Sequence, residues 1–174
     1  MPMIDVTLPV SALAPAQRDE LAGRLTAALL AAEGSPDNRY VRASAWCFFD
    51  ERPAGGIQVG GRHPELPVYR VVLTIPAGSP ALSGPFRLVN RERLVRVVTE
   101  AVLEVEGAGY SDAAATRVWV QVREIQEGYW GAAGGIGRME DIAGVAGVTP
   151  DGRLTARAER IRRALDIAAA AGPV

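Results

Sequence analysis

Residues 2–8 read PMIDVTL, and this short stretch decides the fold that we expect. Apolar side chains fall at positions 4, 6 and 8, and mixed ones fall at positions 3, 5 and 7. This is the period-two pattern of a half-buried strand. Pro2 opens the strand directly after Met1. Removal of Met1, which we expect before so small a residue, would turn Pro2 into a secondary amine that the strand holds in place.

A terminal amine of this kind can serve as a catalytic base. The pKa of an α-amino group is ordinarily roughly 8, and burial beside cationic groups lowers it toward the range in which a general base works at neutral pH. All 19 basic residues are arginines, because the sequence contains no lysine. No side-chain amine therefore competes with the terminus.

The composition is that of a globular chain with one domain or two small fused units. It has 174 residues, 48% hydrophobic content and a net charge of -1. No basic stripe interleaved with aromatic residues occurs, so we expect no nucleic-acid partner. No apolar run approaches the roughly 18 residues of a membrane span, and no signal peptide precedes the first strand. We therefore expect no membrane association and a cytoplasmic location.

The single cysteine and the single histidine bear on redox and metal chemistry. Cys47 lies in an apolar run beside Trp46 and Phe48, which indicates a core thiol rather than a nucleophile. His63 lies in a loop rich in glycine and proline. One cysteine and one histidine make a zinc site of the usual ligand type unexpected, and we predict neither a metal nor a cofactor.

A strand-helix-strand unit occurs twice along the chain. The patterns predict strands over residues 2–8, 41–50, 67–73 and 117–122, helices over 15–34 and 90–106, and turns or short hairpins over 53–61 and 128–135. We therefore predict one domain over residues 1–137, made of units 1–66 and 67–137. Residues 138–174 would then form an irregular linker over 138–152 and a helical arm over 155–170.

Two such units should place four strands in one sheet with both helices on the same face, because the crossovers are right-handed. Polar or mixed side chains remain on the other face, namely those of Asp5, Arg70, Arg117 and Gln121. This pattern indicates a central cavity or an oligomer interface on that face rather than a second layer of helices.

The chain resembles the tautomerase superfamily through three features: Pro2, the second unit that starts at Pro67, and a glycine-rich hairpin carrying Trp130 and Gly131. The hairpin resembles that of 4-oxalocrotonate tautomerase, and residues 50–61 resemble the two-unit cis-3-chloroacrylic acid dehalogenase branch. The resemblance covers residues 2–137. It implies an α+β tautomerase or MIF-like fold, a four-stranded mixed sheet with two helices on one face, a C-terminal helix, and homotrimers with sites near subunit boundaries.

The resemblance also implies roles for individual residues. Pro2 would be the base, and Arg42 and Arg117 would resemble the strand arginine that binds a carboxylate. Trp130 would form the apolar wall. Weaker candidates for contact with the substrate are Arg70, Arg87 and Arg123. Surface salt bridges, hairpin packing and, for Arg70, a structural pair with Asp5 remain alternatives for these side chains.

Departures from the dehalogenase pattern narrow the range of reactions that we expect. Leu29 takes the place of a histidine, Gln121 that of a tyrosine, and residues 74–78 that of a stretch with paired arginines. Activation of water needs a positioned base, for which Glu124 is the one candidate, and only if its strand end turns inward. Hydrolytic dehalogenation is therefore disfavoured.

The preferred function is a cofactor-independent tautomerase that acts on a 2-oxo or 2-hydroxydienoic acid, a small carboxylate. A decarboxylase, hydratase, dehalogenase or cyclase that uses Pro2 remains an alternative. So does a noncatalytic ligand-binding or structural trimer that retains Met1.

Overall fold

The computed structural model describes residues 2–78, 80–85, 87–149 and 151–171. The strands are β1 (Met3–Pro9), β2 (Trp46–Arg52), β3 (Tyr69–Pro76), β4 (Val118–Ile125), β5 (Gly131–Ala132) and β6 (Gly135–Ile136). The helices are α1 (Pro15–Glu33), α2 (Arg39–Ala43), α3 (Pro80–Ser83), α4 (Arg87–Glu106), α5 (Asp112–Ala115), α6 (Met139–Ala146) and α7 (Ala156–Ala170). Met1, and with it the question of its removal, lies outside the described residues.

The four long strands form one mixed sheet in the order β2-β1-β3-β4, as the two-unit pattern predicts. Strand β1 is parallel to β2 and antiparallel to β3, and β3 is parallel to β4. Met3 pairs with Trp46 on one side and with Thr74 on the other. The start of β1, and therefore Pro2, lies at the middle of one end of the sheet.

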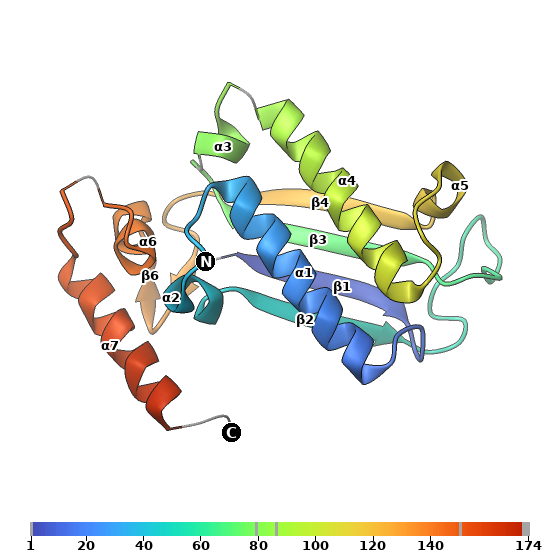
Figure 1. Cartoon of the computed structure of the whole chain (residues 1–174), viewed down its shortest axis with the longest axis horizontal. Coiled ribbons are helices and arrows are strands. Elements are labelled where there is room, and N and C mark those ends of the chain that lie inside the picture. Colours follow the sequence, from blue (N-terminus) through green and yellow to red (C-terminus); the bar gives the residue numbers. More distant parts are fainter. Residues whose placement is uncertain (1, 79, 86, 150, 172–174) are drawn as a thin grey trace.

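Helices α1 and α4 lie side by side across one face of this sheet (Figure 1). The apolar side of β1, with Ile4, Val6 and Leu8 fully buried, packs in the same core as the leucines of α1 and the apolar stripe of α4. Pro15 begins α1, and Gly34 ends it in the left-handed conformation, with a φ of 67°. The predicted α+β fold is confirmed.

No described element of this chain covers the other face of the sheet. This face carries Asp5, Arg70 and Gln121, as expected, but Arg117, also expected there, pairs instead with Glu106 at the end of α4. The face also carries large apolar side chains. Trp46, Phe48 and Trp119 are 60%, 42% and 71% exposed. Exposed aromatic side chains gathered on one face are typical of an interaction surface.

The prediction of a strand over residues 41–50 is wrong in its first half. Residues 39–43 form helix α2, because the Asn38 side chain accepts hydrogen bonds from the main-chain nitrogens of Tyr40 and Val41 and so caps the helix. Strand β2 begins only at Trp46, and its side chains are half-buried or exposed. The strand that forms is therefore shorter and less deeply buried than the apolar run predicts.

The prediction of an irregular linker over residues 138–152 is also wrong, because residues 139–146 form helix α6. Asp141 stabilises this helix: its buried carboxylate accepts hydrogen bonds from the Arg138 main-chain nitrogen and from the Thr155 hydroxyl. Thr155 in turn caps α7, so the predicted C-terminal helix is confirmed. A buried carboxylate thus joins the starts of the two C-terminal helices.

Helix α6 is held beside α2 at the end of the sheet where the chain begins (Figure 1). Two main-chain carbonyls at its carboxyl end accept hydrogen bonds: that of Ala146 from the Asn38 side chain at 2.9 Å, and that of Val145 from Arg162 of α7 at 3.1 Å. Among the described residues, no helix has the length and apolar character that crossing a membrane requires.

Candidate active site

Pro2 is buried at the start of the central strand. Its main-chain carbonyl accepts a hydrogen bond from the Trp46 nitrogen at 3.2 Å, so sheet pairing extends to this residue. Pairing on both sides of β1 restricts the backbone around Pro2. The structure therefore places the predicted base at a fixed, enclosed position, as a positioned catalytic group requires.

Pro2 lines a small cavity where segments distant in the sequence meet. Glu33 comes from the end of α1 and Ser35 from the turn that follows, while Val41 and Ser44 come from α2 and its carboxyl end. Helix α6 closes the cavity with the apolar side chains of Ile142, Val145 and Ala146. The volume is about 20 Å³, which is room for one water molecule.

Glu33 is the acidic residue in this cavity, and no pattern in the sequence marks it as a site residue. Burial raises the pKa of its carboxyl above the ordinary value, and the positive charge of the amino terminus opposes that shift. Its position as the last residue of α1, before Gly34, looks like an ordinary helix end in the sequence. Only the closure of α2 and α6 over this end of the sheet makes it a site residue.

The two arginines predicted from the strand positions do not line the Pro2 cavity of their own chain. Arg42 lies on α2 and forms a bidentate ion pair with Asp37, with Nη2 2.7 Å from Oδ2. Arg117 lies beside Tyr69 at the start of β3, whereas Met3 pairs with Thr74. Five residues of strand, roughly 16 Å, therefore separate the level of Arg117 from the end of the sheet that holds Pro2.

The weaker arginine candidates occupy three different places. Arg70 donates a hydrogen bond to the Thr7 hydroxyl at 3.1 Å, because the register pairs it with Thr7 and not with Asp5. Arg87 is exposed at the start of α4. Arg123 pairs in register with Thr74, the partner of Met3, so it is the candidate arginine of β4 at the Pro2 end of the sheet.

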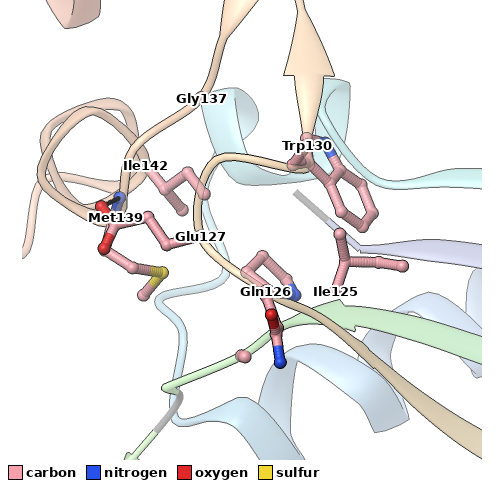
Figure 2. A pocket seen from close by; sticks show the side chains of 9 residues that line it. Ile125, Gln126, Glu127, Trp130, Gly137, Met139 and Ile142 are labelled. Atoms are coloured by element: carbon pink, nitrogen blue, oxygen red, sulfur yellow. Dashed lines mark hydrogen bonds between the residues drawn. The ribbon is translucent and has the colours of Figure 1, made fainter.

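Trp130 lines a second, neighbouring cavity of about 10 Å³. Figure 2 shows its indole beside Ile125, with Ile142 and Met139 of α6 on the opposite side. Ile142 also lines the Pro2 cavity, so α6 lies between the two cavities. The side chain of Ile142 therefore lies between Trp130, the predicted apolar contact for the substrate, and Pro2, the predicted base.

Two further side chains have structural partners. The Glu124 carboxylate accepts a hydrogen bond from the Ser83 hydroxyl and lies 3.0 Å from Nη2 of Arg91, so its strand end does not turn toward Pro2. Burial, with a contribution from the Asp5 carboxylate, raises the pKa of the Cys47 thiol to about 12. Cys47 packs against the main core, as expected for a core thiol.

Comparison with solved structures identifies the architecture. N1, a member of the cis-3-chloroacrylic acid dehalogenase family, matches with a TM-score of 0.67 at 17% identity, over 95% of this chain and 99% of that one. A fused 4-OT solved as an asymmetric trimer matches with a TM-score of 0.59 at 23% identity, over 77% and 94%. This chain has the tautomerase fold. The resemblance seen in the sequence is therefore confirmed at the level of the fold.

A third structure of this fold is Pt0534 inactivated by 2-oxo-3-pentynoate, with a TM-score of 0.60 at 19% identity, over 77% of this chain and 94% of that one. The N1 match covers all but 5% of this chain. Residues 138–174 are a larger share of the chain than that, so the match includes most of them. Neither a protein-family model nor a curated protein matches the sequence.

Proposed function

We propose that this chain is a cofactor-independent isomerase in which Pro2, after loss of Met1, moves a proton on a 2-oxo or 2-hydroxydienoic acid. The observation that carries the proposal is the burial of Pro2 at a cavity on the central strand of a tautomerase fold. Burial disfavours the cationic form of an amine, which leaves the nitrogen available as a base. The absence of lysine leaves the terminus as the only amine.

Binding of the substrate requires more room than the cavity has. A six-carbon acid does not fit within about 20 Å³, so the Ile142 and Val145 side chains of α6 move aside in the proposed complex. Once the substrate is bound, the same apolar side chains exclude water and strengthen the electrostatic interactions within the site. A decarboxylase, hydratase or cyclase would use the same proline and differ in the product released.

Replacing Pro2 with alanine should lower kcat/KM for ketonisation of phenylenolpyruvate by at least about 100-fold, because the positioned secondary amine is lost. Stopped-flow absorbance measures the rates. Pro67→Ala is the matched control, because Pro67 occupies the same place in the second unit but its nitrogen lies within a peptide bond. Equal rates for Pro2→Ala and the wild type would refute the proposal.

Two mass measurements test the state of the terminus. Loss of Met1 should be visible in the intact mass, whereas its retention would support the noncatalytic alternative. Treatment with 2-oxo-3-pentynoate, the compound that inactivated Pt0534, should add one equivalent to the wild type at the amino-terminal peptide. Labelling elsewhere, or none, would contradict a reactive terminal amine.

We also propose that the enzyme is a homotrimer built on the open face of the sheet. The exposed Trp46, Phe48 and Trp119 support this assembly, as does the trimeric form of the fused 4-OT. A trimer built on the open face offers Arg70 of β3 and Arg123 of β4 a route to the site of a neighbouring subunit.

Trp119→Glu should dissociate this trimer, because it places a charge on an apolar interface. Light scattering coupled to size-exclusion chromatography measures the mass of the particle. Tyr129→Glu is the control, since Tyr129 is 79% exposed but lies outside the sheet. A monomeric wild type would overturn the proposed assembly.

A further inference from the structure

We propose that Glu33 is a second catalytic residue of this site, that it exchanges a proton with the substrate opposite Pro2, and that the site selects acids with a single carboxylate. The inference rests on the proposed function and extends it to a residue and a substrate class. The supporting observation is the set of side chains that line the Pro2 cavity.

The polar side chains of that cavity are Glu33, Ser35 and Ser44, and the rest of its lining is apolar. No described residue that lines it carries a positive side chain. No hydrogen bond from another described side chain or main-chain group reaches the Glu33 carboxylate, whereas Glu106 and Glu124 are bound by Arg117 and Arg91. The amino terminus is the positive group that acts on this carboxyl, and a partly buried acid beside a terminal amine is a candidate functional pair.

Placement supports a catalytic role for this carboxyl. Glu33 ends α1 on the side of the sheet where β1 begins, so a helix end and a strand start present an acid and an amine to one cavity. Burial raises the pKa of Glu33, which makes its carboxylate a stronger base toward the enol hydroxyl. Once it has accepted that proton, the neutral carboxylic acid can donate a hydrogen bond to the carbonyl oxygen that forms, the task otherwise assigned to an arginine.

The proton balance of ketonisation is complete with these two groups. Prolinium donates its proton to C3 of the enol while the Glu33 carboxylate accepts the proton of the enol hydroxyl. The C2–C3 double bond supplies the electron pair of the new C3–H bond, and the electrons of the O–H bond form the C2–O double bond. Glu33 then returns its proton to the Pro2 nitrogen, so the protein neither gains nor loses a proton.

Substrate selection follows from the same arrangement. An acid with one carboxylate can direct its enol toward Glu33 and its carboxylate away from it. A dicarboxylate has less freedom to do so, and a second negative charge beside Glu33 is repelled. Phenylenolpyruvate should therefore be turned over with at least a tenfold higher kcat/KM than 2-hydroxymuconate.

The pH dependence of the activity should reflect the titration of Pro2 and Glu33 together. Pro2 and Glu33 are the titratable groups among the described residues that line the cavity, since those from α2 and α6 are Val41, Ser44, Ile142, Val145 and Ala146. The active form holds one proton shared between the amine and the carboxyl. Activity should fall at low pH, where both are protonated, and at high pH, where neither is.

The test compares Glu33→Gln with the wild type on phenylenolpyruvate. The substitution should lower kcat by about 100-fold and remove the acid limb of the profile, because the amide cannot be protonated and Pro2, which must carry a proton to donate it to C3, then titrates alone. Asp19→Asn, an exposed acid on the same helix, is the control and should change neither. Glu33→Arg should shift selectivity toward 2-hydroxymuconate. Circular dichroism of each variant verifies that it folds.

The outcomes separate this inference from the proposed function. A Pro2-dependent wild type with an unchanged Glu33→Gln profile would overturn the role of Glu33 and leave the isomerase proposal standing. Equal turnover of both substrates by the wild type would overturn the selectivity and indicate cationic groups from another subunit. A wild type whose rate does not depend on Pro2 would refute the proposed function itself.

Discussion

Replacing Arg117 with methionine should lower the free energy of unfolding by about 3 kcal/mol and leave kcat of the folded enzyme unchanged. The guanidinium forms a bidentate ion pair with Glu106, with nitrogen-oxygen distances of 2.8 and 2.7 Å, and it also donates to the Pro67 carbonyl. The two side chains are only 13% and 12% exposed. Loss of one partner leaves Glu106 as an almost buried, unpaired charge, which is the costly case.

The position of this pair explains why the effect should reach the whole domain. Glu106 ends α4, Arg117 directly precedes β4, and Pro67 lies just before β3, so the pair joins a helix and two strands far from Pro2. Urea denaturation should show a lower midpoint with an unchanged slope.

The double variant Arg117→Met with Glu106→Leu is the matched control for this prediction. Removal of both charges should restore most of the lost stability, because a buried ion pair and an apolar pair of similar size are nearly equivalent. The opposite pattern, full stability of Arg117→Met with a large loss of kcat/KM, would show that Arg117 binds the substrate, as the family resemblance implies.

The fold could be predicted from the sequence because its main elements carry local signals. Residues 2–8 alternate with the period of a strand, and the leucines of α1 are spaced with the period of a helix. Pro15 and Gly34 mark the ends of that helix. The hydrophobic stripe of α4 and its stop at Gly107 are equally local. The division into domains at residue 137 stays a prediction.

The surroundings of Pro2 could not be predicted in the same way. Helix α2 depends on a cap by Asn38, which lies in a polar segment just before the predicted strand, and α6 depends on Asp141, which is buried by contacts with Thr155 and Arg157. Glu33 becomes a site residue only when these helices close over the start of β1. The ion-pair partner of each arginine could not be predicted either, because the sequence does not show which of the 20 acidic residues lies beside it in the fold.

The closure of α6 over Pro2 leads to the second large effect. Replacing Gly144 with valine should destabilise the packing of α6 on α7 by about 3 kcal/mol. A methyl group added at Gly144 would lie 2.7 Å from Cβ of Ala158 and 3.7 Å from Cδ2 of Leu154. Ala158 is fully buried, so the added side chain fits only if the two helices move apart. Hydrogen exchange of the α6 and α7 amides measures the loss.

Gly23→Ala is the control that separates crowding from the general effect of a side chain at a helical glycine. No heavy atom lies within 4 Å of a methyl group added at Gly23 of α1, so this change should stabilise the protein by about 0.5–1 kcal/mol. Because α6 supplies the apolar wall over Pro2, Gly144→Val should also speed labelling by 2-oxo-3-pentynoate at the terminus. Unchanged exchange in α6 and α7 would show that this contact does not hold the two helices together.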